Sequence, residues 1–213
     1  MPSTRSATKG ERTRDRIVAA AAPLFNQRGY VGASLADLMA ATGLEKGGIY
    51  RHFESKDALA LAAFDHAVAL HRRRLVARVA ATTGAVARLT ALVDAMAGVA
   101  DDPAVPGGCP LLNTAIETDD GAGSSHAELR KRTRLAMRRL LGYVRRLIER
   151  GVADGELDPA VDAALEAAML VATMEGALML AKLYDDPRYV TQAATRLARQ
   201  AAAMAATARP AAF

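Results

Sequence analysis

Apolar side chains recur every three to four residues along most of the chain, which is the spacing of helices that bury one face. Strict alternation of apolar and polar residues, the pattern of a half-buried strand, is not found in any segment. Glycine, proline and capping residues divide the pattern into about nine predicted helices. They span residues 11–28, 35–41, 45–52, 56–80, 85–98, 110–117, 128–150, 160–183 and 188–205. The predicted fold class is all-α.

Composition agrees with this pattern. Of the 213 residues, 51% are hydrophobic and only 4% are aromatic, which favours a helical core rich in alanine and leucine. Cys109 is the single cysteine, so an intrachain disulfide is excluded and a reducing compartment, the cytoplasm, is expected. We expect neither a membrane span, because apolar runs stay below about 18 residues, nor a secretory signal, because the N-terminus is polar.

Two short predicted helices, 35–41 and 45–52, are joined by a turn at Thr42 and Gly43 and form a helix-turn-helix. Ser34 is the expected N-cap of the first, and Gly43 can adopt the positive φ that the turn requires. The preceding helix 11–28 completes a three-helix head. Its small core is predicted from Leu35, Leu38, Met39, Leu44, Ile49 and Phe53. We predict a DNA-binding domain over residues 1–56 and a helical body over 57–213.

Positive charge gathers in two places. Residues 1–56 hold nine Lys and Arg against five acids, and residues 128–150 hold nine against two, in a chain of net charge +5. The first cluster suits a polyanionic partner of the head. For the helix 128–150, a solvated face is the default interpretation, and a second nucleic-acid surface is the alternative.

The head closely resembles the TetR family of regulators over about 45 residues. The matching residues are Phe25, Gly29-Tyr30, Ala33-Ser34-Leu35-Ala36-Asp37-Leu38, the string Thr42-Gly43-Leu44-Glu45-Lys46-Gly47-Gly48-Ile49-Tyr50-Arg51-His52-Phe53, and Ser55-Lys56-Asp57-Ala58-Leu59. The resemblance implies a homodimer that reads a palindromic operator in double-stranded DNA. It also implies that the helices 160–183 and 188–205 pair with their mates in a four-helix bundle.

Chemistry supports the DNA-binding roles that the resemblance implies. Ser34 can offer its N–H and hydroxyl to a phosphate, Lys46 can reach a phosphate or a guanine edge, and the two glycines after it permit close approach to the groove. The family often has a small polar residue where this chain has Glu45, which can accept from a cytosine amino group. The predicted DNA-binding residues are Ser34, Glu45, Lys46, Gly47, Gly48, Tyr50, Arg51, His52 and Lys56.

The body is expected to bind a small apolar or electrophilic effector. Cys109 precedes Pro110 at a helix start, where backbone N–H groups stabilise a thiolate. Similar strings occur in TetR relatives that sense electrophiles or oxidants, although a buried structural cysteine is the favoured interpretation. For each apolar candidate, a place in the core is likewise favoured over a ligand contact. The predicted ligand-binding residues are Met96, Cys109, Leu112, Asn113, Ile116, Glu117, Met137 and Met174, with Met169 as a further apolar candidate.

The predicted function is sequence-specific transcriptional regulation, as a repressor released from its operator by an effector or by cysteine modification. A ligand-independent architectural DNA-binding protein and a transcriptional activator are the alternatives. An enzyme is disfavoured, because the four histidines lack metal-binding spacing and no glycine-rich phosphate loop follows a strand. We expect no catalytic residues, no metal and no cofactor.

Overall fold

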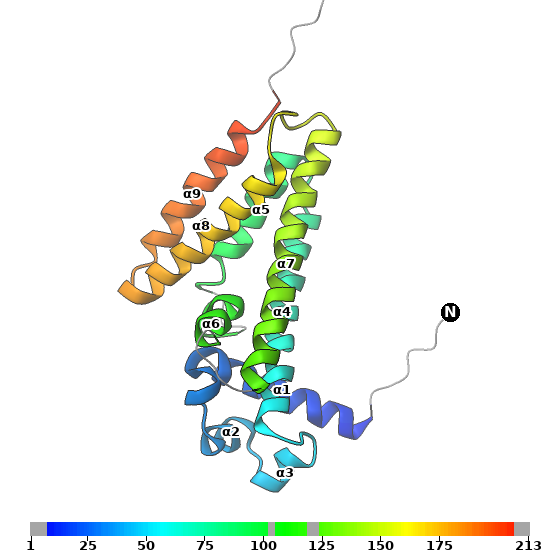
Figure 1. Ribbon diagram of the computed structural model, residues 1–213, viewed down its shortest axis with the longest axis vertical. Coiled ribbons are helices and arrows are strands. Elements are labelled where there is room, and N and C mark those ends of the chain that lie inside the picture. Colours follow the sequence, from blue (N-terminus) through cyan, green and yellow to red (C-terminus); the bar gives the residue numbers. More distant parts are fainter. Residues whose placement is uncertain (1–7, 102–104, 119–123, 207–213) are drawn as a thin grey trace, which may run out of the picture. The chain divides into compact units, whose positions relative to one another are not determined.

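Nine helices make up the regular structure of the computed structural model, which describes residues 8–101, 105–118 and 124–206 (Figure 1). They are α1 (Lys9–Gly32), α2 (Leu35–Thr42), α3 (Lys46–Tyr50), α4 (Lys56–Ala80), α5 (Ala85–Ala97), α6 (Pro110–Glu117), α7 (Ser124–Ala153), α8 (Ala163–Tyr184) and α9 (Arg188–Ala203). Within the described ranges, extended pairing is limited to one bridge between Leu157 and Ala205, and the predicted all-α class is confirmed. Residues 1–7, 102–104, 119–123 and 207–213 lie outside the described residues.

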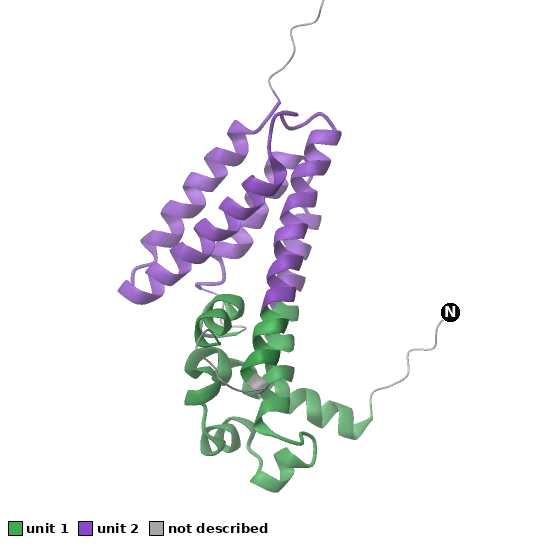
Figure 2. Cartoon of the chain, viewed as in Figure 1, with its two compact units in different colours: residues 1–70, 103–133 green, residues 71–102, 134–213 purple. Residues whose placement is uncertain are grey.

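The helices divide into two compact units, each built from two separate stretches of chain (Figure 2). Unit 1 combines residues 1–70 with 103–133, and unit 2 combines residues 71–102 with 134–213. Unit 1 therefore holds the predicted helix-turn-helix together with α6 and the first turns of α7. This division describes packing, and the functional boundary between residues 56 and 57 stays a prediction.

The core of unit 1 is formed where the apolar stripes of α1 to α4 meet. Its fully buried members are Ile17, Val18, Ala21, Ala22, Leu38, Ile49, Phe53, Leu59 and Ala63. Of the six residues predicted for this core, Leu38, Ile49 and Phe53 are buried, while Met39 and Leu44 pack against its edge. Leu35 is half-buried. The burial of Ile49 fixes α3 against the rest of the unit.

Gly29 bends α1 where the sequence predicts the helix to end. Its backbone has φ 75° and ψ 173°, and one further turn follows to Gly32. This left-handed φ is accessible to glycine at little cost. A Cβ at this position would also lie 2.7 Å from Glu117 Oε1, so the bend lets α6 approach the end of α1 closely.

Unit 2 is a helical bundle in which α5, α8 and α9 pack against one another. Leu89, Leu92, Val93, Met174 and Ala201 are all buried in it. α7 contributes Val144 and Ile148 from its predicted apolar stripe, and the rest of that stripe is half-buried. The fold class and the positions of these helices therefore follow from the 3.6-residue pattern.

The boundaries of two helices in unit 2 differ from prediction. α8 begins at Ala163 rather than at residue 160, because Asp162 is its N-cap and accepts hydrogen bonds from the N–H groups of Ala164 and Leu165. α7 begins at Ser124 and continues to Ala153, beyond the predicted end at residue 150. Gly151, the residue after the predicted end, lies inside α7, and the chain turns at Gly155 with φ 74°.

Judged by length and composition alone, one helix among the described residues, α8, is long and apolar enough to cross a membrane. Glu166 and Glu175 interrupt its apolar run, and the expectation of no membrane span stays a prediction. One such helix is weak evidence, and 39% of the window is buried inside the chain. Its exposed large apolar side chains are Leu165, Met169, Met179 and Leu183. The buried face of α8 is accounted for by packing, and its exposed apolar face resembles a protein interface.

The position of Gly151 generates a stability prediction. A Cβ there would lie 2.6 Å from the Cβ of Ala85 and 2.7 Å from Leu157 Cδ1. We expect Gly151→Ala to lower the free energy of unfolding by about 1–3 kcal/mol in urea, because the Ala85 Cβ can yield only if backbone moves and the Leu157 side chain is fully buried.

Gly142→Ala is the matched control for this experiment, since it adds the same methyl group inside the same helix. Its Cβ would meet only the far end of the Arg146 side chain, at 3.2 Å. We expect unchanged stability or a gain of up to about 1 kcal/mol. Equal stabilities for the two variants would contradict the packing role of Gly151.

Candidate nucleic-acid interface

The start of α2 is held by a capping box between Ser34 and Asp37. The Ser34 hydroxyl accepts from the Asp37 N–H, while the Ser34 N–H and hydroxyl donate to Asp37 Oδ2 at 3.0 and 2.7 Å. These hydrogen bonds, followed by the Arg28 guanidinium, hold the pKa of Asp37 below its ordinary value. Both donors that Ser34 would offer to a phosphate are therefore already given to Asp37 in the free chain.

The turn between α2 and α3 has the geometry expected of a helix-turn-helix. Gly43 adopts φ 66° and ψ 22°, and its N–H donates to Met39 O, which ends α2. Thr42 Oγ1 donates to Leu38 O at 2.7 Å. Glu45 then stands as the N-cap of α3 without a side-chain capping bond. The side chain of Glu45 is exposed and remains available to a partner.

α3 separates a buried anchor from an exposed face. Ile49 is 1% exposed in the core, whereas Lys46, Gly47 and Arg51 are exposed to solvent. Gly48, Tyr50 and His52 are half-buried. Because the helix has five residues, it spans only about 7.5 Å, and its outer face is narrow.

The two glycines of α3 are not explained in the same way. A Cβ on Gly48 would lie 3.4 Å from Leu44 Cβ, an ordinary packing contact at the helix start. A Cβ on Gly47 would meet no atom within 4 Å, and its φ is not positive. Neither packing nor backbone conformation in the free chain therefore calls for glycine at position 47.

Lys56, at the first residue of α4, is positioned by Tyr30. Its Nζ lies 4.7 Å from the centre of the Tyr30 ring, and the Tyr30 hydroxyl donates to the carboxylate of Asp57. The ring of His126 meets Tyr30 edge-on at 5.4 Å. Sequence analysis missed this role of Tyr30, although the residue belongs to the string that resembles the family.

The predicted ligand-binding residues fall into both units. Cys109, Leu112, Asn113, Ile116 and Glu117 lie in unit 1, while Met96, Met137 and Met174 lie in unit 2. Ile116 is 63% exposed and Met174 is fully buried. Met169, the further apolar candidate, is exposed on α8. Grouping these residues into one pocket stays a prediction.

Asn113 and Glu117 on α6 bind the end of α1. Asn113 Nδ2 donates to Asn26 O, Asn26 Oδ1 and Gly107 O at 2.8–3.0 Å, and Glu117 Oε1 accepts from the Val31 N–H at 3.0 Å. Asn26 Nδ2 in turn donates to the carbonyls of Pro106 and Gly108, both at 3.0 Å. The polar side chains proposed as effector contacts thus hold the loop before α6 against α1.

Cys109 is the half-buried N-cap residue at the end of this loop. Its carbonyl accepts from the Asn113 N–H at 3.1 Å, and Pro110 occupies the first turn of α6 as predicted. Cys109 therefore directly follows the loop residues whose carbonyls accept hydrogen bonds from Asn26 and Asn113.

One buried polar atom of unit 2 was not foreseen. His71 Nε2, on α4, is buried and has no hydrogen-bond partner in the described part of the chain. Burial, reinforced by Arg74, lowers the pKa of His71 and favours the neutral imidazole. No sequence signal distinguishes His71 from the other histidines.

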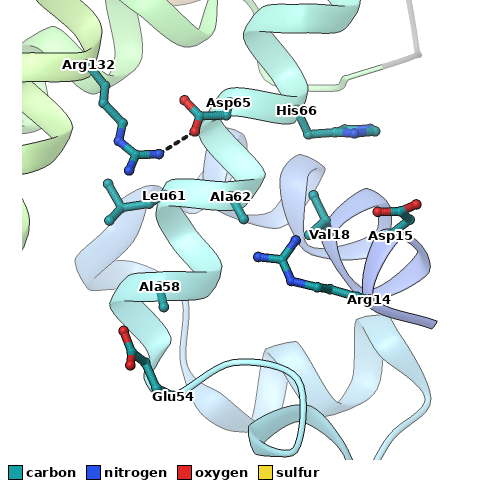
Figure 3. A pocket seen from close by; sticks show the side chains of 10 residues that line it. All are labelled: Arg14, Asp15, Val18, Glu54, Ala58, Leu61, Ala62, Asp65, His66 and Arg132. Atoms are coloured by element: carbon teal, nitrogen blue, oxygen red, sulfur yellow. Dashed lines mark hydrogen bonds and ion pairs between the residues drawn. The ribbon is translucent and has the colours of Figure 1, made fainter. Parts of the chain in front are cut away.

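A cleft of about 550 Å³ opens on unit 1 between α1 and α4 (Figure 3). At the edge of the cleft, the guanidinium of Arg132 on α7 forms an ion pair with Asp65 on α4. Arg132 Nε also lies 3.1 Å from Glu128 Oε1. Three carboxylates and two arginines line the cleft together with His66 and an apolar floor. The three carboxylates outnumber the two arginines, so the cleft does not have the positive charge that suits a phosphate backbone.

Within the described ranges, no three His, Cys, Asp or Glu side chains lie close enough together to hold a metal ion. Arg14 stacks over Phe53 at 4.5 Å.

Both parts of the chain match known families. Residues 17–63 match the bacterial regulatory proteins of the tetR family, and residues 85–197 match the tetracyclin repressor-like C-terminal domain. A TetR transcriptional regulator from Chloroflexus aurantiacus J-10-FL, known from a crystal structure, is 46% identical. The match covers 92% of this chain and 98% of that one, with a TM-score of 0.86.

Two further relatives are more distant. The TetR-family regulator of Cytophaga hutchinsonii, also solved, is 34% identical over 95% of this chain and all of its own, with a TM-score of 0.87. An uncharacterised helix-turn-helix transcriptional regulator in the lacX 3′ region of Lactococcus lactis subsp. lactis is 26% identical over 175 residues, or 82% of this chain and 85% of that protein.

Proposed function

The chain belongs to the TetR family of transcriptional regulators, and from this premise we propose that it is a repressor that an effector or a modified cysteine releases from a palindromic operator. Members of this family bind DNA, form dimers and are not enzymes. The proposal adds the sign of regulation, the shape of the operator and the cause of release. It also places the protein in the cytoplasm, where DNA and reduced thiols coexist.

The observation that carries the DNA-contact part of the proposal is the empty space beside Gly47. Glycine costs about 1 kcal/mol relative to alanine within a helix, and the free chain offers no contact or strain that would require it at this position. A surface that approaches the helix from outside supplies the missing reason. The floor of a major groove is such a surface, since it admits an α-helix with side chains against base edges.

Each exposed residue around Gly47 then has a role that its chemistry suits. Lys46 contacts a phosphate or a guanine edge, and Arg51 contacts the backbone. Glu45 accepts from a cytosine amino group at the groove floor. Tyr50, His52 and Lys56 contact phosphates, with Tyr30 holding the Lys56 ammonium in place.

Ser34 contacts a phosphate only if its donors turn away from Asp37. The exchange replaces two hydrogen bonds to the Asp37 carboxylate with two to a phosphate, and both kinds are charge-assisted, so it takes place only where a phosphate is present. Ser34 is thus a contact that forms on binding.

Dimerisation through α8 and α9 supplies the second recognition helix. α8 exposes Leu165, Met169 and Leu183, and Tyr184 follows at its end with 61% of its surface exposed. Burying such an apolar face between two copies is the usual reason for a soluble chain to carry it. A two-fold dimer then reads half-sites about 34–36 Å apart, or a multiple of that spacing.

Release begins, in our proposal, at the loop before α6. The carbonyls of residues 106, 107 and 108 are held by Asn26 and Asn113, and Cys109 follows directly. An adduct on the Cys109 sulfur pushes this loop away and withdraws the partners of Asn26, which lies on α1 of the head. The conformations with and without the adduct then differ in how well the two heads fit the operator.

A second class of effector acts without the thiol. An apolar ligand among Met96, Met137 and Met174 in unit 2, with a polar group at the unpartnered His71 Nε2, would favour the same released state. Methionine suits such a site because its side chain adapts to irregular shapes.

An activator and a ligand-independent architectural protein are the competing assignments. An architectural protein binds all duplexes alike, whereas a repressor retards one palindromic duplex and leaves it when the effector is added. An activator retards the same duplex but raises transcription from a template that carries it in vitro. These two assays separate the three assignments.

Substitution at Gly47 tests the contact with DNA. We expect Gly47→Leu to leave the urea unfolding midpoint within experimental error or raise it slightly, because the side chain points into open space. Operator affinity should fall at least 100-fold in a gel shift, since the side chain occupies the space that the groove floor fills. Ala80→Leu, at the exposed end of α4 in unit 2, is a control that also places a leucine side chain at an exposed helical position, and it should bind the operator as the wild type does. Unchanged operator affinity in Gly47→Leu would contradict the proposed orientation of α3.

Alkylation tests the cysteine route. The thiolate of Cys109 adds to the β-carbon of a small enal, its sulfur–carbon bond forms as the carbon–carbon double bond opens, and a solvent proton goes to the α-carbon. Cys109 is the single thiol in the sequence, so mass spectrometry can follow one adduct. We expect the operator dissociation constant of the adduct to rise at least ten-fold, while Cys109→Ala binds the operator and ignores the enal.

The outcome that contradicts the cysteine route is a fully alkylated wild-type protein with unchanged operator affinity. Such a result would leave the repressor proposal standing on the apolar effector alone. If Asn113→Ala is alkylated as fast as the wild type but responds less, the asparagine contacts carry the signal, as proposed.

A further inference from the structure

The outer face of α7 carries a concentration of positive charge that the helix-turn-helix does not use. Residues 134–150 of this helix belong to unit 2, and their apolar stripe turns inward through the buried Val144 and Ile148. The opposite side presents six exposed arginines and one acid. The arginines are Arg134, Arg138, Arg139, Arg145, Arg146 and Arg150, and the acid is Glu149.

Five of these arginines have no carboxylate within ion-pair distance in the described part of the chain. The exception is Arg145, whose Nε lies 3.1 Å from Glu149 Oε1. Arg134 with Arg138, and Arg146 with Arg150, are like-charged neighbours one turn apart, which destabilise a helix by about 0.2–0.5 kcal/mol per pair. An ordinary solvated face intersperses both signs and avoids this cost. The arrangement therefore points to a polyanionic partner.

The dimensions of this face fit a nucleic-acid duplex. From Arg134 to Arg150 the helix rises about 24 Å, a length over which B-DNA carries about 14 phosphates. Gly142, at the centre of the face, has no side chain, and the Arg146 guanidinium lies over it, 3.2 Å from where a Cβ would stand. The face is thus a row of guanidinium groups, which bind phosphate oxygens in pairs.

A membrane surface fits the same charges less well. Helices that lie in a lipid interface insert an apolar face beneath their cations. The apolar stripe of α7 is instead buried within the chain, and between the arginines only Leu135 is apolar and exposed, at 40%. Contact through charge alone suits a phosphodiester backbone.

We infer that the outer face of α7 between Arg134 and Arg150 is a second, sequence-independent contact surface for duplex DNA. Because the family binds DNA through its N-terminal domain, duplex DNA is the polyanion held close to every bound protein molecule. The α7 face adds phosphate contacts without base contacts, so it raises affinity for long DNA and leaves the choice of operator to α3.

The test compares two full-length triple variants that each remove three exposed, unpaired arginines from unit 2. R138Q/R139Q/R146Q alters the α7 face, and R72Q/R73Q/R78Q alters α4 as the matched control. Both lower the formal net charge from +5 to +2, which is the sequence value less three. Circular dichroism and urea unfolding verify that both remain folded.

Affinity for a 60-base-pair duplex of random sequence is measured between 50 and 200 mM NaCl. We expect the α7 variant to bind at least ten-fold more weakly at low salt and its salt slope to be shallower by about one per lost phosphate contact. The α4 variant should stay within about two-fold of the wild type. Equal losses in both variants would show that net charge alone sets the affinity and would overturn the inference, as would no loss in the α7 variant.

Two further arms locate the contacted DNA and keep this inference separate from the proposed function. If the α7 variant loses affinity for an operator with long flanking DNA but not for a short operator, the α7 face contacts the flanking DNA. If the α7 variant is impaired only in recruiting a second duplex to the protein–operator complex, the α7 face contacts a separate DNA molecule. If the wild type shows no preference for any operator, the proposed function fails while the random-duplex comparison still decides the role of α7.

Discussion

The burial of Ile49 is the interaction on which the DNA-reading surface depends. A helix of five residues with two glycines cannot sustain itself, since helices shorter than about 12 residues are marginal in water. α3 exists because Ile49 is held among the side chains of α1, α2 and α4, and because the left-handed Gly43 delivers the chain to it. Because Ile49 alone anchors α3, the exposed positions of the helix can contact a partner. For the same reason, Gly47 needs no packing contact within the chain.

The same unit also contains the segment that we propose to sense chemical change. Residues 105–118 pack with α1 through Asn26, Asn113 and Glu117, so the loop at Cys109 and the head share hydrogen bonds directly. Such bonds are directional, and leaving the buried Asn26 side chain without its partners costs about 1–3 kcal/mol. A modest change at the loop therefore has a physical means of altering the head. Unit 2 contributes the apolar face for a second copy and the arginine row of α7.

Much of this fold could be predicted from periodicity and capping residues. The capping box at Ser34 and the turn at Gly43 were expected from local chemistry, because both involve residues close in sequence. The packing role of Gly151 could not be predicted, because a glycine that ends a helix and one that admits a close neighbour look alike in sequence, and Ala85 is 66 positions away. The contacts of Asn113 and Glu117 within the chain could not be predicted either, and their role as ligand contacts stays a prediction. Their partners Asn26 and Val31 are 87 and 86 residues distant, so only the folded chain reveals the pairing.

The proposed regulation requires that α3 lies in the major groove of the operator twice, once from each subunit. Methylation of guanine N7, a major-groove atom, measures this directly on a duplex selected by the protein from random sequences. We predict two protected clusters whose centres are one helical turn, about 10–10.5 base pairs, or a multiple of it apart, related by two-fold symmetry. A selected duplex on which the bound protein protects no guanine N7, or protects a single unpaired cluster, would contradict the account.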